Sequence, residues 1–387
     1  MYPPAGYSKA KPGEVCHLRR SLYGLKQASR QWNHEFCTKL VAYGFVQSAH
    51  DSCLFVKHSG AVFLVLLVYV DDVLVTGSNL QDILDLKSFL DTTFTIKDLG
   101  VAKYFLGLEI ARTPTGCYLN QRKYILDILS DTGLLSCKPA TTPFPAGLKL
   151  IESVGPPFAD PERYRRLIGR LLYLNLTRPD ITFCIQQLSQ FVTNPFDTHW
   201  EAALHLLRYL KGCPSLGLFF PARSSLSFQA YSDVDWAACQ DSRKSVTGYC
   251  IFLGSCLISW KIKKQTTVSR FSAEAEYRAL GSTVYEIQWL TYLAKDLHLD
   301  IPTPIPLYCD NQVALHIMAN PVFHERTKHL EIDCHLVRNQ YKAGLISPVK
   351  VPSSSQLADL FTKALGAGPF QSLLSNLGLI DIHQTPT

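Results

Sequence analysis

Residues 226–264, LSFQAYSDVDWAACQDSRKSVTGYCIFLGSCLISWKIKK, decide the fold of the last third of the chain. Three apolar, partly alternating runs are separated here by turns that contain Asp, Ser and Gly, and this pattern predicts three successive strands. Apolar residues at helical spacing from about residue 273 to 297 then predict one long helix. The stretch therefore favours a domain in which helices pack on a sheet.

Further elements complete this domain. The segment IPLYCDN (305–311) predicts the end of a strand, and SPVKVP (347–352) predicts another strand. Helices are expected at residues 312–318, 330–342 and, in QLADLFTKAL, 356–365. The order is three strands, a helix, a strand, two helices, a strand and a helix, and we assign residues 226–366 to this domain.

Four acidic residues stand at the ends of these elements. Asp233 ends the first strand, Glu276 lies early on the long helix, Asp310 ends the strand IPLYCD, and Asp359 opens the last helix. Because such positions can meet at one edge of a mixed sheet, we expect the four side chains to converge. A cluster of carboxylates is electrostatically tolerable only with divalent cations between them, so this arrangement predicts metal ligands.

Each of these assignments has an alternative. Asp235 could be the ligand instead of Asp233, or, because alternation places the two on the same strand face, it could only lie beside the metals. Glu274 points to another helix face and is expected to be a solvated surface charge. Asp310 could act only as the N-cap of a helix. Asp359 lies in a first helical turn, where the helix dipole alone would favour a carboxylate.

A second pair of carboxylates lies in AVFLVLLVYVDDVLVTG (61–77). Asp71 and Asp72 fall between two strongly apolar runs, which predicts the tip of a β-hairpin. Burying an ionised carboxylate is costly unless it is paired or bound to metal. We therefore expect a divalent cation here, against the alternative that the two residues form a solvated turn.

The segments SLYGLKQASRQW (21–32), YVDD (69–72) and KYFLGLEI (103–110) resemble the reverse transcriptase of copia-type LTR retrotransposons. The resemblance extends from the first residue to about residue 365. It implies that Asp71 and Asp72 hold metal ions in the polymerase palm. It also implies nucleic-acid contacts by Gly24, Lys26, Gln27 and Ser29 near the incoming nucleotide and template, and by Leu106 and Gly107 in the primer grip.

One carboxylate of the resembled polymerase site has no counterpart. Two-metal phosphoryl transfer needs carboxylates from more than one strand around two cations about 4 Å apart. No strand precedes MYPPAGY, the first Asp is Asp51, and Glu14 lies in a stretch rich in Pro, Gly and Lys. We therefore expect no DNA polymerisation by this chain alone, and a partner chain could supply the missing palm segment.

The order of Asp233, Glu276, Asp310 and Asp359 resembles that of ribonuclease H. The resemblance implies two Mg²⁺ ions, with Mn²⁺ as a substitute, that activate a water and stabilise the leaving oxygen of an RNA phosphodiester. The implied partners are an RNA–DNA hybrid and template–primer nucleic acid, recognised through sugars and phosphates. The rival hypothesis is a non-catalytic, nucleic-acid-binding relic of a Pol polyprotein.

The order of predicted elements and a Pro-rich connector divide the chain into four parts, which the resemblance identifies. They are a partial reverse transcriptase palm and thumb (1–139), a Pro-rich linker and helical connection (140–225), the ribonuclease H domain (226–366) and a tail (367–387). In the connection, apolar spacing predicts helices at residues 162–176 and 200–210. The expected fold is α+β with α/β character: a truncated reverse transcriptase palm, a helical connection and a ribonuclease H-like mixed sheet.

Basic residues between the third strand and the long helix are candidates for phosphate contacts. They are Lys261, Lys263, Lys264 and Arg270, and a solvated basic edge is the alternative. The segment NPVFHERTKHLEIDCHLVR contains His324, His329 and His335, which could shuttle protons or contact phosphate. Their spacing matches neither a zinc finger nor a zincin motif.

Composition indicates a globular protein and excludes several classes. The chain has 387 residues, enough for two or three domains, and a formal net charge of +6 that identifies no partner. Its 12 Cys include no C-x-x-C pair, and no G-x-G-x-x-G or P-loop is present. The longest apolar run, 61–70, is too short to span a membrane. We expect no secretion or anchor, and the resemblance implies an intracellular location, in a cytoplasmic particle or the nucleus.

Overall fold

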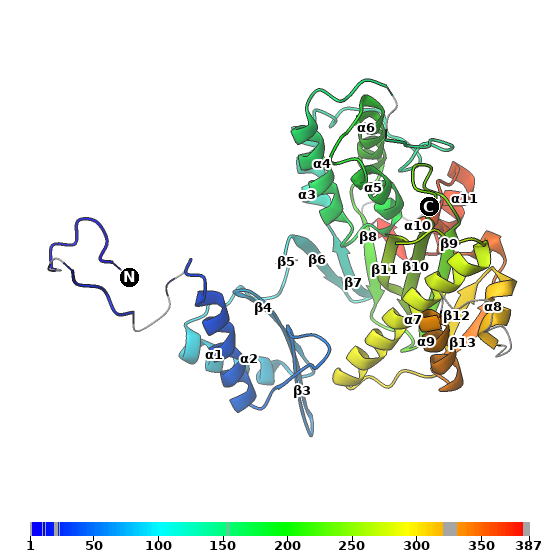
Figure 1. Ribbon diagram of the computed structural model, residues 1–387. Helices are drawn as coiled ribbons and strands as arrows, with labels where there is room; N and C mark the ends of the chain where they lie inside the picture. The colour runs from blue at the N-terminus through cyan, green and yellow to red at the C-terminus, as the bar shows by residue number, and fades with distance from the viewer. Residues whose placement is uncertain are drawn as a thin grey trace. The chain divides into compact units, whose positions relative to one another are not determined.

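The computed structural model describes residues 2–381 except residues 10, 12, 19–21, 23, 153–154 and 320–330. The chain forms two compact units (Figure 1), which are Met1–Gly100 with Lys295–His298 and Val101–Ala294 with Leu299–Thr387. The boundary expected near residue 139 therefore falls inside the second unit. Among the described residues, no helix combines the length and the apolar character needed to cross a bilayer.

The first unit is a four-stranded antiparallel sheet with two helices. Its strands, in spatial order, are β1 (Val46–Gln47), β2 (Leu54–Ser59), β3 (Val62–Tyr69) and β4 (Asp72–Gly77). Helices α1 (Ala28–Ala42) and α2 (Leu80–Phe94) supply Phe36, Leu40, Leu86 and Leu90 to the core. Along β3, alternate residues Leu64, Leu66 and Val68 are buried, as expected for a sheet with one covered face.

The hairpin predicted at residues 61–77 is confirmed. Tyr69 pairs with Asp72, so Val70 and Asp71 form a two-residue turn between β3 and β4. Val70 has a φ of 54°, in the left-handed region that two-residue hairpin turns use. This turn leaves Asp71 and Asp72 exposed.

The larger sheet of the second unit contains the three strands predicted from residues 226–264. Strands β9 (Phe228–Asp235), β10 (Val246–Leu253) and β11 (Cys256–Lys264) are antiparallel neighbours. Strand β12 (Ile305–Cys309) lies parallel both to β9 and to β13 (Ile346–Lys350), which gives the order β11-β10-β9-β12-β13. The predicted long helix is also confirmed, as α7 (Ser272–Asp296).

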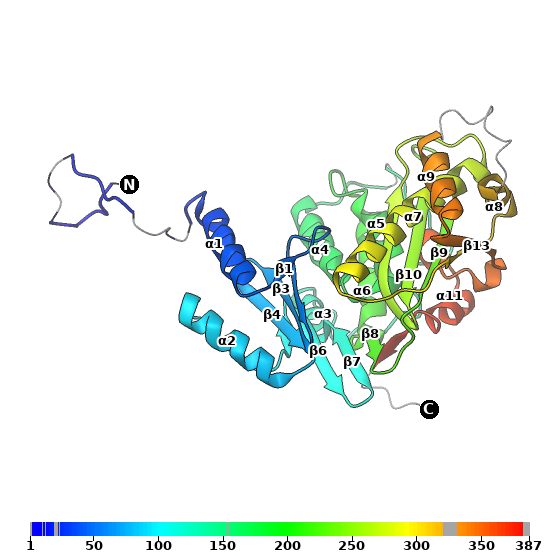
Figure 2. The same ribbon diagram turned by 90° about the horizontal axis from the view of Figure 1, so that it is seen from below.

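Alternate residues of β10 face two different cores. Tyr249 and Ile251 pack with α7, which lies along one face of the sheet (Figures 1 and 2). Cys250 and Phe252 belong to the core on the other face. That core includes α3 (Arg122–Asp131), α4 (Pro161–Leu174), α5 (Thr182–Ser189), α6 (Asp197–Gly212), α10 (Asp359–Thr362) and α11 (Ala367–Leu374). Because both faces are covered, β10 is a nearly continuous apolar run.

The other predicted helices are present, and one of them is shorter than expected. The segments predicted at 162–176 and 200–210 correspond to α4 and α6, and α4 begins at the N-cap Asp160, whose carboxylate accepts from the Arg163 N–H at 2.9 Å. Helices α8 (Gln312–Ala319) and α9 (Glu331–Lys342) separate β12 from β13. The helix predicted at 356–365 is shorter, because α10 contains only four residues.

A second sheet in this unit joins segments that are far apart in the sequence. Its strands, in spatial order, are β14 (Leu379–Asp381), β8 (Leu216–Pro221), β7 (Gly116–Asn120), β6 (Leu108–Thr113) and β5 (Tyr104–Phe105). The Tyr118 hydroxyl lies within hydrogen-bonding distance of the carbonyl oxygens of Ser215 and Ile380. One sheet therefore takes strands from three of the four predicted parts, which explains why residue 139 does not separate compact units.

Candidate metal centre

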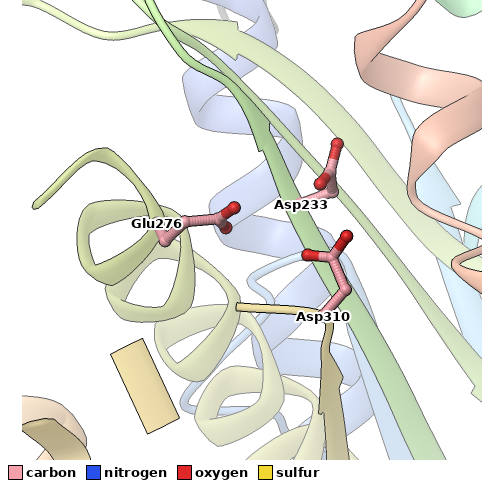
Figure 3. Close-up of side chains that lie close together, drawn as sticks. All are labelled: Asp233, Glu276 and Asp310. Atoms are coloured by element: carbon pink, nitrogen blue, oxygen red, sulfur yellow. The ribbon is translucent and has the colours of Figure 1, made fainter. Parts of the chain in front are cut away.

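Three carboxylates converge at the carboxyl ends of the parallel strands β9 and β12 (Figure 3). Asp233 comes from β9, Glu276 from the second turn of α7, and Asp310 from the residue after β12. One oxygen of each side chain lies within 4.8 Å of the others. Asp233 and Glu276 are buried and Asp310 is half-buried. The structure thus brings together three of the four carboxylates that the sequence singles out.

The fourth carboxylate, Asp359, is joined to this group by a lysine. Asp359 is the first residue of α10 and is buried. The Lys363 ammonium lies 2.7 Å from Asp359 Oδ1 and 3.4 Å from Asp233 Oδ2. Asp359 does not belong to the group of three, but its carboxyl interacts with Asp233 directly as well as through Lys363.

A glycine allows α10 to reach Asp233. Gly248 lies opposite Asp233 in the antiparallel pair of β9 and β10. A Cβ atom on Gly248 would lie 2.7 Å from Thr362 Cγ2 and 2.8 Å from Phe361 Cβ, so α10 packs against bare backbone. This approach lets the Thr362 hydroxyl donate a hydrogen bond to Asp233 Oδ2. The sequence gives no local signal for Gly248 or Thr362, because their contact joins distant segments.

Two further hydrogen bonds fix the surroundings of the carboxylates. The Ser353 hydroxyl donates to Asp310 Oδ2 at 2.8 Å. The Gln356 amide donates to the Ser232 carbonyl at 3.0 Å, which ties the segment before α10 to β9. Partners of this kind orient carboxylates around a metal and are part of the site.

Burial and like charges oppose ionisation of Glu276. Burial is the largest cause, followed by Asp233 and Asp310, and together they raise the pKa of Glu276 to about 9. Its Oε2 atom is buried and has no hydrogen-bond partner within the described residues. A buried carboxylate oxygen without a donor, beside two other carboxylates, fits a divalent cation as the missing partner.

The pKa values of Lys363 and Asp359 are both raised, in part by the charge of Asp233. Burial lowers the pKa of Lys363, but attraction by Asp233 and Asp359 outweighs this effect and the pKa is raised. Burial and then repulsion by Asp233 raise the pKa of Asp359. Lys363 therefore stays positively charged inside the cluster.

The expectation that Glu274 is a solvated surface charge is wrong. Its side chain is buried, accepts a hydrogen bond from the Arg270 backbone N–H at 2.9 Å and pairs with Arg278 at 2.9 Å. Glu274 therefore stabilises the first turns of α7. Asp235, the alternative to Asp233, is half-buried and lies outside the group of three, and burial raises its pKa.

The N-cap alternative for Asp310 is also settled. The residue that caps α8 is Asn311, whose side-chain oxygen accepts from the Ala314 N–H at 3.0 Å. Asp310 instead accepts from Ser353 and points toward Asp233 and Glu276 (Figure 3). Its carboxylate is therefore available to a ligand.

The residues predicted for the polymerase site lie apart from this cluster in the sequence. Asp71 and Asp72 are exposed, and no third His, Cys, Asp or Glu joins them in a metal-ligating group within the part of the chain that the structure describes. Lys26, Gln27 and Ser29 are exposed around the start of α1. Their roles stay predictions.

The turn at Gly107 is held by α4. Leu106 and Gly107 have φ values of 49° and 71° and connect β5 to β6. The Tyr173 hydroxyl donates to the Leu106 carbonyl, and a Cβ atom on Gly107 would lie 2.7 Å from that hydroxyl oxygen. Both the backbone conformation and the contact with Tyr173 therefore require glycine at this position.

The predicted basic contacts differ in exposure. Lys261 and Lys263 are exposed on the edge strand β11, and Arg270 is exposed before α7. Lys264 instead donates to the Gln190 side chain at 2.9 Å. Phosphate binding by these residues stays a prediction. His335 is exposed on α9, whereas His324 and His329 lie outside the described residues.

Residues 1–146 match the family model described as reverse transcriptase (RNA-dependent DNA polymerase). The chain is 44% identical to the retrovirus-related Pol polyprotein from transposon RE1 of Arabidopsis thaliana, over 97% of the chain and 26% of that protein. It is 32% identical to a putative transposon Ty5-1 protein of Saccharomyces cerevisiae, over 74% of the chain and 94% of that protein.

Solved structures give a weaker likeness. The N-terminal RNase H domain of a Mycobacterium tuberculosis protein, solved as a fusion with maltose-binding protein, aligns at 14% identity with a TM-score of 0.26. The alignment covers 39% of this chain and 98% of that one. A TM-score this low establishes no common fold.

Proposed function

The chain belongs to the copia-type retrotransposon Pol polyproteins, and we propose that its residues 226–366 form a ribonuclease H that cuts RNA in RNA–DNA hybrids. Residues 1–146 are a reverse transcriptase-like domain. The chain spans 26% of the length of the RE1 polyprotein. Any activity of the complete polyprotein is therefore attributed to this chain only as a proposal.

The observation that carries the proposal is the buried group of Asp233, Glu276 and Asp310. Within the described residues, Lys363 pairs with Asp233 and Asp359, whereas Glu276 Oε2 has no partner. An ordinary structural ion pair therefore does not explain the group. A divalent cation with oxygen ligands would do so, because it gives the buried oxygen a partner and offsets the repulsion.

The order of the strands also supports the proposal. Three antiparallel strands are followed by a helix and then by β12, which lies parallel to the first of them, and this order resembles the sheet of ribonuclease H. The parallel pair places Asp233 and Asp310 at neighbouring carboxyl ends, where open sheets of this kind bind their ligands.

Each acidic residue receives a role in the proposal. Asp233, Glu276 and Asp310 would hold one Mg²⁺ ion, and Asp233 with Asp359 would hold the second. The two bound ions would supply a water of lowered pKa and stabilise the leaving oxygen of the RNA strand. Thr362 orients Asp233 through its hydrogen bond. Ionised Glu276 is the form that binds metal, so binding releases its proton at neutral pH.

The basic residues and the two parts of the chain also have proposed roles. Lys261, Lys263 and Arg270 would contact the phosphates of the hybrid. In functional terms, residues 226–366 would be the ribonuclease H part and residues 1–139 the reverse transcriptase part. We do not propose primer extension, because within the described residues Asp71 and Asp72 lack a third metal-ligating side chain. A partner chain could supply it.

The test is cleavage of a hybrid with a labelled RNA strand by the purified chain in Mg²⁺ or Mn²⁺. The variants D233N, E276Q and D310N should each abolish cleavage and should leave the fold intact. The matched control is E201Q, which removes an exposed carboxylate on α6 and should cleave like the wild type. Tight binding of the hybrid by the wild type without any cut would refute the enzyme and support the nucleic-acid-binding relic.

A further inference from the structure

Lys363 carries a positive charge into the carboxylate cluster from the end of α10. Its ammonium lies 2.7 Å from Asp359 Oδ1 and 3.4 Å from Asp233 Oδ2. The Lys363 side chain is 35% exposed, whereas the side chains of Asp233 and Asp359 are 2% and 10% exposed. The lysine therefore reaches from the solvent side to two buried carboxylates that would otherwise repel each other.

The ammonium contacts the two carboxylates that would hold a second divalent cation. Asp233, Glu276 and Asp310 gather their oxygens within 4.8 Å and define the first cation position. Asp359, the remaining carboxylate, shares the Lys363 ammonium with Asp233. We infer that Lys363 is a tethered counter-ion of the second metal position, which a divalent cation fills only by displacing the ammonium. The inference rests on the proposed ribonuclease H function.

This arrangement should give the two cation positions different affinities for a divalent ion. Within the described residues, a first ion would meet three carboxylates, one of them with an unpartnered oxygen, whereas a second ion would compete with a lysine that already pairs with Asp233 and Asp359. A neighbouring charge at this range shifts carboxylate equilibria by about 1–3 pKa units, which corresponds to at least about tenfold. The second ion should therefore bind about tenfold more weakly than it would without the lysine.

The experiment counts Mn²⁺ ions bound to the full chain, by electron paramagnetic resonance of the free ion at pH 7.5. The variants are K363Q, which removes the charge, K363R, which keeps it, and the control K138Q, which alters an exposed lysine. We expect one tight and one weak ion in the wild type, K363R and K138Q. In K363Q the second dissociation constant should fall about tenfold. An unchanged or weaker second ion in K363Q would overturn the inference.

Thermal unfolding separates this role from that of a structural ion pair. Without metal, K363Q should have a lower Tm than the wild type, because Asp233 and Asp359 lose their counter-charge. Saturating Mn²⁺ should close the difference, because the second ion replaces the ammonium. A Tm difference that persists at saturating Mn²⁺ would mean that Lys363 only stabilises the fold, and would contradict the inference.

Amine labelling of the wild type gives a test that needs no variant. Acetylation of Lys363, followed by mass spectrometry, should increase at the Mn²⁺ concentrations that fill the second position, while acetylation of Lys138 stays constant. Labelling of Lys363 that does not respond to Mn²⁺ would also overturn the inference. If these measurements succeed but the wild type never cuts a hybrid, the proposed function fails alone. If the wild type binds no Mn²⁺, both fail.

Discussion

Replacement of Gly248 by alanine tests how closely α10 must approach β10. The new methyl group would lie 2.7 Å from Thr362 Cγ2 and 2.8 Å from Phe361 Cβ, both close to the helix backbone. Neither contact can be relieved by moving the end of a long side chain, so α10 itself must shift. The shift would move Thr362 away from Asp233 and would carry Asp359 and Lys363 with it.

The expected magnitude follows from overpacking of a filled core. Inserting a methyl group into such a site costs about 1–3 kcal/mol. For a unit of this size each kcal/mol lowers the Tm by about 2–4 °C, so the Tm of G248A should fall by about 2–12 °C. Because Asp359 and Thr362 move together, Mn²⁺ binding and hybrid cleavage should fall as well. Differential scanning calorimetry and the Mn²⁺ titration measure the two effects.

The control for this substitution is G169A. Gly169 lies in the exposed interior of α4, where a Cβ atom would meet nothing within 4 Å. Alanine there should leave the Tm unchanged or raise it, because alanine is the better helix former by about 1 kcal/mol. The reasoning is refuted if G248A matches G169A in Tm and in Mn²⁺ binding.

Three further predictions follow from the buried charges. Without metal, E276Q should unfold within about 1 kcal/mol of the wild type at pH 4 by urea titration, because below its ordinary pKa the Glu276 carboxyl is neutral in both the folded and the unfolded state; a much larger loss would contradict this. From pH 6 to 9 the metal-free wild type should lose stability relative to E276Q, by at most about 1.4 kcal/mol per pH unit, because the folded state keeps a proton that the unfolded state releases near its ordinary pKa; a flat difference would show that Glu276 is already ionised. R178M should lower the free energy of unfolding by about 3–5 kcal/mol, because it removes the counter-charge of the buried Asp180 carboxylate, which the hydrogen bond from the Tyr209 hydroxyl does not replace; guanidinium denaturation at pH 7 measures the loss, and a much smaller loss would contradict this.

Local patterns in the sequence were sufficient to predict β9, β12 and α7, the strands and the helix that carry Asp233, Asp310 and Glu276. The alternation in residues 226–264 and the long apolar repeat after it depend only on neighbouring residues. Asp233 and Asp310 could be placed because each ends a strand, and parallel neighbouring strands end together. Glu276 could be placed near Asp233 and Asp310 once α7 was expected to cover one face of the sheet.

Features that depend on distant contacts could not be predicted in this way. Gly248 looks like any glycine in a strand until α10 is seen against it. Lys363 reads as a surface lysine, although its ammonium lies between two buried carboxylates. Glu274 was expected to face solvent from helix periodicity alone. Periodicity does not reveal that the Arg270 backbone N–H and the Arg278 side chain both bind its carboxylate.

The sheet that runs from β14 to β5 limits how the gene can be divided for expression. A clone restricted to residues 226–366 would omit every strand of that sheet, and it would also expose the apolar residues that α3, α4, α5 and α6 cover. Such a fragment should be insoluble even if its four carboxylates are intact. The shortest soluble clone should therefore extend from Val101 through Asp381.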